Sequence, residues 1–129
     1  MNTPILPPSM APPAANYVHA MLSTGASRIL HTSGVVPTAP DGSTPADLGE
    51  QAEVVWRNIE AILTEADMLV SNVVSVTTYV VADHLTSLGV VMAARDRALG
   101  DHRAASTLVT VPALARPEWQ MEIAVVAVA

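Results

Sequence analysis

The sequence of 129 residues contains no cysteine and no phenylalanine, and aromatic residues make up only 3% of it. The absence of cysteine excludes disulfide bonds, thiol nucleophiles and cysteine-ligated metal sites. Because aromatic rings are so scarce, the core has to be built from valine, alanine, leucine and isoleucine, whose side chains must pack closely. The same scarcity excludes an aromatic platform on which nucleic-acid bases could stack.

Basic residues are also scarce. Six Lys or Arg residues face twelve Asp or Glu residues, which gives a net charge of −6, and the basic residues form no cluster. A nucleic-acid-binding protein needs a basic surface to displace counterions from phosphates, so we expect no nucleic-acid partner. No apolar run approaches the roughly 20 residues of a membrane span, so we expect no membrane partner.

The beginning of the sequence is crowded with proline and lacks the basic segment of a signal peptide. We therefore expect a cytoplasmic protein whose residues 1–15 form an extended, proline-rich arm. The length of the remainder suits one domain, and no linker or internal repeat divides it. The sequence predicts a single domain over residues 16–129.

The hydrophobic pattern predicts the element order β-β-α-β-α-β-β. A short apolar segment at 17–22, a turn and the segment 28–36 indicate a hairpin. A helix is predicted over 43–68, with Thr44 as its N-cap and Pro45 as its first helical residue. A second helix is predicted over 84–100, ended by Gly100. The remaining strands are predicted over 72–81, 106–111 and 120–129.

Two helices cover only one face of a sheet, which predicts an α+β layer with a second face left open. In the strand over 73–81, Val74, Val76 and Val80 line one side, and Val73 and Tyr79 are among those that line the other. In the last strand, Met121, Ile123 and Val125 lie opposite Glu122, Ala124, Val126 and Val128. Since a semi-apolar face of this size is rarely left in water, we expect self-association through it.

Several segments, taken together and in order, are similar to those of the Rid (YjgF) family. They are "YV" at 17–18, "TSG" at 32–34, "PADLGEQA" at 45–52, "VTTYVVAD" at 76–83 and "STLVTVPALARPEWQMEIAVVAV" at 106–128. The resemblance extends from about Asn16 to the last residues, and its element order agrees with the order predicted from hydrophobicity. The sequence is therefore identified as a member of this family.

The resemblance implies a chorismate-mutase-like subunit that forms a homotrimer around a barrel-like centre. Small-molecule clefts then lie between neighbouring subunits, and active members hydrolyse enamines and imines there without a cofactor. In those members an Arg on the penultimate strand binds the substrate carboxylate, and a Glu on the last strand positions water.

This sequence departs from that pattern at the residues that carry the reaction. The family's Arg aligns with Ser106, its neighbouring Cys with Leu108 and its second Glu with Ala124, whereas its first Glu is retained as Glu122. We predict a divergent enamine- or imine-type hydrolase that does not act on simple 2-imino acids, with Ser106 and Glu122 as catalytic candidates. The alternatives are a serine bonded to backbone and a glutamate paired between subunits.

Further residues are candidates for binding a ligand in the cleft. Tyr17 closes over a ligand or seals a subunit contact, and these two roles are equally compatible with its amphipathic ring. Arg103 replaces the missing Arg only if its loop turns back, and a surface position is the favoured interpretation. The complete set of binding candidates is Tyr17, Ser33, Gly34, Met92, Arg103, Leu108, Trp119 and Ala124.

The four histidines show no metal-ligand spacing. Only His19 and His31 could meet, across the predicted hairpin, and we expect no metal site. A non-catalytic protein that binds a small molecule in the same cleft is the alternative function. Ribonuclease activity is a third, which the acidic composition disfavours.

Overall fold

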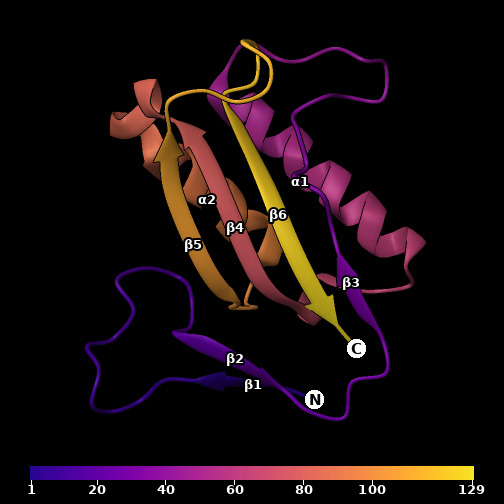
Figure 1. Cartoon of the computed structure of the whole chain (residues 1–129), viewed down its shortest axis with the longest axis vertical. Coiled ribbons are helices and arrows are strands. Elements are labelled where there is room, and N and C mark those ends of the chain that lie inside the picture. The colour runs from indigo at the N-terminus through magenta and orange to yellow at the C-terminus, as the bar shows by residue number, and fades with distance from the viewer.

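Four strands form one mixed sheet in the order β3-β6-β4-β5 (Figure 1). In the computed structural model, which describes residues 1–129, β4 runs parallel to β5 and antiparallel to β6, and β6 runs antiparallel to β3. Two helices pack behind this sheet, which confirms the predicted α+β class. The bounds are β3 (Ile29–His31), α1 (Leu48–Glu65), β4 (Val73–Val81), α2 (Leu88–Leu99), β5 (Ala105–Val111) and β6 (Met121–Val128).

Helix α1 begins one turn later than the sequence predicts. Its N-cap is Asp47, whose carboxylate accepts the backbone N–H of Glu50 at 3.0 Å, so the assignment of Thr44 as N-cap is wrong. Both residue types cap helices well, but only Asp47 lies directly before the first turn that forms. The predicted buried stripe is confirmed, since Ala52, Val55 and Ile59 have no exposed surface.

Helix α2 follows a short 3₁₀ helix, η2 (Ala82–Ser87), and ends where the sequence predicts. Gly100 adopts a φ of 59°, a conformation that most other residues avoid, and its N–H is bonded to the carbonyl of Asp96. The stop at Gly100 fixes the direction in which the chain enters the loop before β5.

The first two strands form a small sheet of their own. β1 (Asn2–Ile5) pairs antiparallel with β2 (Ala20–Ser23), and Figure 1 shows this pair apart from the four-stranded sheet. The predicted hairpin between 17–22 and 28–36 is therefore wrong. Because β1 takes the edge of β2, the Ile29–His31 strand pairs with the much longer β6 instead. From Ala20 onward the element order is the predicted β-β-α-β-α-β-β.

The core lies between the sheet and the two helices. Val76 and Val80 of β4 and Ile123 of β6 have no exposed surface there. Val73 also lies in this core, contrary to the predicted alternation, because a β-bulge between Val73 and Ser75 reverses the side it faces.

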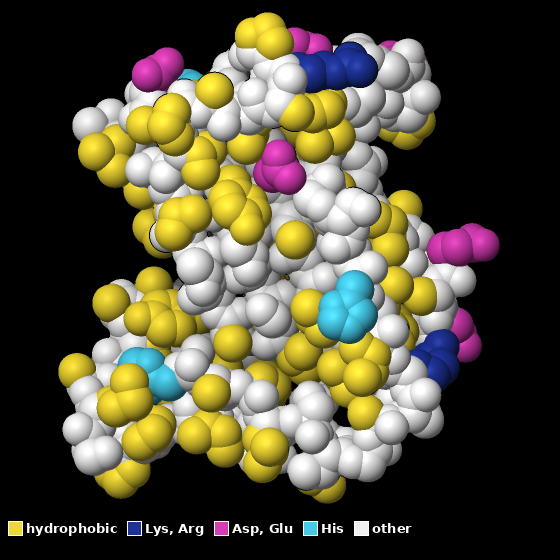
Figure 2. All heavy atoms as spheres, viewed as in Figure 1, with side chains coloured by type: hydrophobic (Ala, Val, Ile, Leu, Met, Phe, Trp, Pro, Cys, Tyr) yellow, Lys and Arg dark blue, Asp and Glu magenta, His cyan; other side chains and the backbone are white.

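Neither helix covers the opposite face of the sheet. Its residues on β4 and β6 are half-buried, apart from buried Val128 beside Asn2 of the small sheet. Figure 2 shows hydrophobic side chains spread across this view, with arginine side chains only near its margins. No helix combines the length and the apolar character needed to cross a membrane.

Candidate functional site

The segment after β3 continues along β6 but carries one extra residue. The N–H of Thr32 donates to the carbonyl of Val125, and the N–H of Val35 donates to the carbonyl of Ile123. Between these two hydrogen bonds the segment after β3 advances by three residues, whereas β6 advances by two. The hydroxyl of Thr32 accepts the N–H of Val125 at 3.0 Å, which satisfies the donor at this irregular point. The extra residue pushes Ser33 and Gly34 out of the regular ladder, as a β-bulge does.

Gly34 leaves room at this bulge for the side chain of Glu122. A Cβ at position 34 would lie 1.8 Å from Oε2 of Glu122, far inside the distance of a non-bonded contact, so a larger residue there would displace the carboxylate. The group that approaches Gly34 most closely is thus the carboxylate of Glu122. This contact brings together Ser33, Gly34 and Glu122.

Glu122 has no charged or hydrogen-bonded partner in the subunit. Its side chain forms neither a hydrogen bond nor an ion pair, although it is half-buried on the open face. Tyr79 lies directly opposite it on β4, and Ala124 faces Thr77 one pair further along. A carboxylate in this setting is available to a ligand or to a second subunit.

Ser106 lies on the other side of the sheet. It is paired with buried Val76 in the parallel ladder, and its Oγ accepts a hydrogen bond from Nη1 of Arg95 on α2 at 3.3 Å. Leu108, two residues on, packs against the core. The expectation that the Ser106 and Leu108 face points into an open cleft is therefore wrong. Strand alternation from Val76 and Thr78 turns this face toward the helices.

Arg95 is the centre of a buried polar cluster that the sequence did not single out as a site. It is 5% exposed, and its Nε and Nη2 donate to Oδ1 of Asp96, each at 3.1 Å. Oδ2 of Asp96 in turn accepts from the side-chain amide of Asn16 at 3.0 Å. The cluster ties helix α2 to β5 and to the N-terminal arm.

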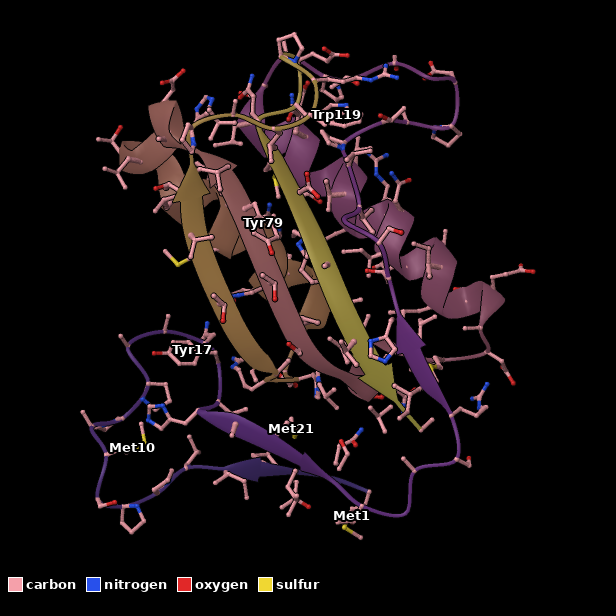
Figure 3. All side chains as sticks on the ribbon, in the orientation of Figure 1. Met1, Met10, Tyr17, Met21, Tyr79 and Trp119 are labelled. Atoms are coloured by element: carbon pink, nitrogen blue, oxygen red, sulfur yellow. The ribbon has the colours of Figure 1, made fainter.

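Tyr17 follows Asn16 directly after the proline-rich arm, and Figure 3 shows it in the loop that leads into β2. Its hydroxyl accepts the N–H of Ala14 at 3.3 Å, and its ring meets that of His19 edge-on at 6.2 Å. His19 and His31 do not meet. Nε2 of His19 bonds to the carbonyl of Ala11 at 2.7 Å, whereas His31 is exposed on β3.

Three other predicted residues are placed by contacts with other parts of the fold. Met92 is half-buried on α2, behind the sheet. Nη1 of Arg103 donates to the carbonyl of Gly100 at 2.7 Å, which fixes it beside the end of α2. Trp119 lies in the loop before β6, where the guanidinium of Arg116 stands 5.3 Å from its ring centre (Figure 3).

Reasoning from sequence missed two residues of chemical interest, Tyr79 and Arg95. Alternation placed Tyr79 on the side of its strand opposite Val76 and Val80, but only the register of β4 with β6 places it beside Glu122. Arg95 was visible as a charged residue on the apolar stripe of its helix. A charge at such a position must find partners, and this is a signal for a polar cluster.

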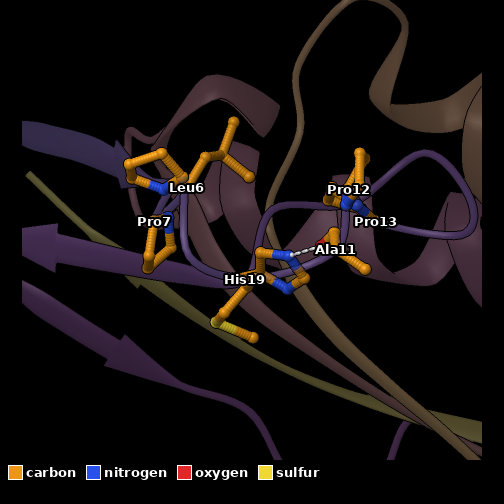
Figure 4. A pocket seen from close by; sticks show the side chains of 8 residues that line it. Leu6, Pro7, Ala11, Pro12, Pro13 and His19 are labelled. Atoms are coloured by element: carbon orange, nitrogen blue, oxygen red, sulfur yellow. Dashed lines mark hydrogen bonds between the residues drawn. The ribbon is translucent and has the colours of Figure 1, made fainter.

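The chain also encloses a hollow of about 350 Å³ within the proline-rich arm (Figure 4). His19 is its only titratable residue, and no group of three His, Asp or Glu side chains could hold a metal ion anywhere in the chain. The hollow contains none of the predicted site residues. It is lined by Leu6, Pro7, Pro8, Met10, Ala11, Pro12, Pro13 and His19.

Comparison with known proteins gives consistent matches. Residues 8–129 match the family model described as endoribonuclease L-PSP. The structure superposes on YyfB of Yersinia pestis, a Rid-family protein of unknown function, with a TM-score of 0.89 and 30% identity over 99% of this chain and 98% of the other. The YjgF gene product of Escherichia coli superposes with a TM-score of 0.72 and is 27% identical, over 98% of each chain.

Two further proteins also resemble the chain. The E. coli protein TdcF, whose structure contains bound serine, has a TM-score of 0.73 at 24% identity and covers 96% of this chain and 93% of its own. The mitochondrial protein MMF1 of Saccharomyces cerevisiae is 32% identical over 78 residues, which are 60% of this chain. This chain thus spans about half the length of the yeast protein, 52% by alignment.

Proposed function

The chain belongs to the endoribonuclease L-PSP family, also called the Rid or YjgF family, and from this premise we propose that it binds a small imine or enamine beside Glu122 and hydrolyses it. The substrate is larger or less charged than a simple 2-imino acid. The cleft that holds it is completed by a second copy of the chain.

The observation that supports this proposal best is the placement of Glu122. Its carboxylate lies against Gly34 at a backbone bulge, on the open face of the sheet, without any partner in the subunit. Leaving a half-buried carboxylate unpaired costs stability, and such groups are enriched at functional sites. A fold-stabilising role would have given it a cation or a backbone N–H.

The chemistry needs one group that moves a proton. The imine reacts as its protonated iminium form. Glu122 accepts a proton from water as the water oxygen bonds to the iminium carbon and the π electrons of the C=N bond move to nitrogen, which leaves a neutral carbinolamine. The carboxylic acid then gives this proton to the nitrogen, and as the C–N bond breaks the carboxylate accepts the proton of the hydroxyl that becomes the carbonyl oxygen. That proton passes to the released ammonia or amine, so the products are a carbonyl compound and an ammonium ion, and Glu122 is again ionised. Tyr79, opposite Glu122, is placed to donate a hydrogen bond to the same bound molecule.

The substrate class follows from the charges beside Glu122. No arginine or lysine occurs in any of the four strands of the large sheet, and Arg95 is occupied by Asp96 and Ser106 on the covered side. Within the subunit, a carboxylate-bearing substrate would find no arginine or lysine beside Glu122 and would be repelled by its carboxylate. We therefore expect imines that lack a carboxylate.

A second copy is proposed because the open face is semi-apolar. Val109 is 40% exposed and Ile29 60% exposed, on the two edge strands. Packing of these faces would form a homotrimer, as we expected from the sequence. Sedimentation equilibrium at micromolar concentration should give three times 13.5 kDa, and a monomer would contradict the proposal of a shared cleft.

The test of the reaction compares two ways of making an imine. An amine oxidase supplies imines without a carboxylate, and an amino-acid oxidase supplies 2-imino acids. The protein should accelerate release of the carbonyl compound above the spontaneous rate only with the first source. Glu122→Gln should remove at least about 90% of the acceleration, because loss of a general base typically slows a reaction by about a hundred-fold or more. The matched control, Glu118→Gln, changes an exposed glutamate in the preceding loop.

The alternative function is binding without turnover. It is favoured because no hydrogen bond orients the carboxylate of Glu122 within the subunit, whereas a general base has to be positioned for the proton that it removes. Ligand binding that depends on Glu122, without acceleration from either imine source, would support this alternative. Ribonuclease activity is disfavoured, because the open face has no cation for phosphates and the chain carries a net charge of −6.

A further inference from the structure

A hollow of about 400 Å³ lies where the small sheet meets the loop between α2 and β5. This volume is within the usual range of small-molecule pockets. The loop contributes three consecutive residues that carry charge or a titratable ring. The rest of the lining combines apolar side chains with two polar ones, Asn2 and Ser71, and does not include Glu122, Gly34 or Tyr79. The loop residues are Asp101, His102 and Arg103, and the apolar ones include Leu6, Val18 and Met21.

Arg103 in this hollow has one edge of its guanidinium free. Nη1 donates to the carbonyls of Gly100 and His102, at 2.7 and 3.1 Å. Nε and Nη2 donate to no protein atom. These two nitrogens form the edge that binds a carboxylate through two parallel hydrogen bonds. The bonds of Nη1 hold the group in place, so little conformational entropy is lost when a ligand binds.

The loop itself is also fixed. Nε2 of His102 donates to the carbonyl of Val73 at 2.6 Å, which anchors the loop to the start of β4. The next residue but one, Ala104, is buried, and its carbonyl accepts the N–H of Val18. The guanidinium of Arg103 is therefore presented from a rigid backbone on both sides.

Asp101 brings the opposite charge to the same hollow. Its carboxylate is exposed and forms no ion pair with the guanidinium of Arg103, so the charged atoms of the two side chains lie more than 4.0 Å apart. Two opposite charges that share a hollow without neutralising each other suit a ligand that carries both charges. The wall of Leu6, Val18 and Met21 then suits an aliphatic side chain.

We infer that this hollow binds a free α-amino acid with an aliphatic side chain. The carboxylate of the amino acid pairs with the Nε–Nη2 edge of Arg103, its ammonium group pairs with Asp101, and its side chain packs on the apolar wall. The site lies within one subunit and is independent of the function proposed for Glu122. A bound amino acid would join the small sheet to the loop that precedes β5.

The test is calorimetric titration with L-leucine, 4-methylpentanoate and 3-methylbutylamine. The last two keep the aliphatic group but lack the ammonium and the carboxylate, respectively. L-Leucine should bind, and each analogue should bind about ten-fold or more weakly, since each loses one charge-assisted pair. Absence of leucine binding at millimolar concentration would overturn the inference.

Variants locate the binding. Arg103→Lys keeps the charge but removes the paired Nε and Nη2 donors. Asp101→Asn removes the negative charge of an exposed residue, where we expect no effect on folding. Each variant should weaken leucine binding about ten-fold or more. Arg116→Lys, remote from the hollow, is the matched control. Glu122→Gln should leave leucine binding unchanged. Loss of binding in Glu122→Gln but not in the Arg103 variant would place the amino acid in the other site and overturn the inference.

Discussion

The two faces of the large sheet are made by the same strands but have opposite character. On the covered face, Val76, Val80 and Ile123 have no exposed surface. On the open face, Tyr79, Glu122 and Ala124 each keep part of theirs, and Glu122 keeps a free carboxylate. One face of each strand therefore stabilises the subunit, and the other remains available for contacts with a ligand or another subunit. Mutations on the two faces should therefore affect different measurements.

The largest effect is expected from the covered face. Ile123→Ala should lower the free energy of unfolding by about 3 kcal/mol, because it removes three buried carbon atoms and leaves a cavity. Val126→Ala, on the open face of the same strand, should cost less than about 1 kcal/mol within a subunit. Urea unfolding at low protein concentration measures both. Equal losses would show that the two faces do not differ in their contribution to stability.

The next effect concerns the buried charge on the covered side. Arg95→Ala should cost about 2 kcal/mol, because Asp96 and the Ser106 hydroxyl lose their partner, although Asp96 is partly solvated. Arg95→Met fills the same space without the charge and should cost less. The control is Arg97→Ala, whose pair with Glu53 is exposed and should contribute less than about 0.5 kcal/mol. A loss for Arg97→Ala as large as that for Arg95→Ala would contradict this ranking.

A smaller effect on stability, but a large one on function, is expected at Gly34. Gly34→Ala must displace the carboxylate of Glu122, and it should reduce imine hydrolysis or ligand affinity about ten-fold while costing about 1 kcal/mol of stability. Gly89→Ala is the control. Its Cβ would meet open space in α2, and it should stabilise the helix by up to about 1 kcal/mol. Full activity in Gly34→Ala would remove Glu122 from the site.

The smallest effect is at Asp41, where hydrogen bonds from the side chain and backbone of Ser43 hold the pKa of the carboxyl below its usual value. Because the folded-state pKa is lowered, the associated stability is present above the unfolded-state pKa and is lost as pH falls through the folded-state pKa. Ser43→Ala should raise the pKa of Asp41, as measured by NMR titration. An unchanged pKa would show that the side-chain bond is not its cause.

Most of the fold could be predicted from local patterns, because helix periodicity and strand alternation depend only on residues close together in the sequence. The assignments that were wrong depend on residues far apart in the sequence. The partner of Ala20–Ser23 is decided by the availability of Asn2–Ile5, and the side that Val73 faces is decided by a bulge against β6. Neither fact is encoded in a short window.

The candidate site, too, could be predicted only where it depends on local patterns. Alternation along the last strand correctly separated Glu122 and Ala124 from Met121 and Ile123. The contact of Glu122 with Gly34 depends on the bulge, and its pairing with Tyr79 depends on the register of β4. Both bring together segments far apart in the chain. Ser106 was misplaced because its side of the strand is fixed by its pairing with Val76 rather than by its own neighbours.

The position of β6 has a consequence for how the chain assembles. β6 lies between β3 and β4, yet it follows every other element in chain order. Until it emerges from the ribosome, β3 has no partner and β4 has an open edge, so two of the sheet's three interfaces are absent. During synthesis the chain therefore exposes hydrophobic strand edges that can pair with another chain. Completion of the sheet, and with it the positioning of Glu122, is a single late event.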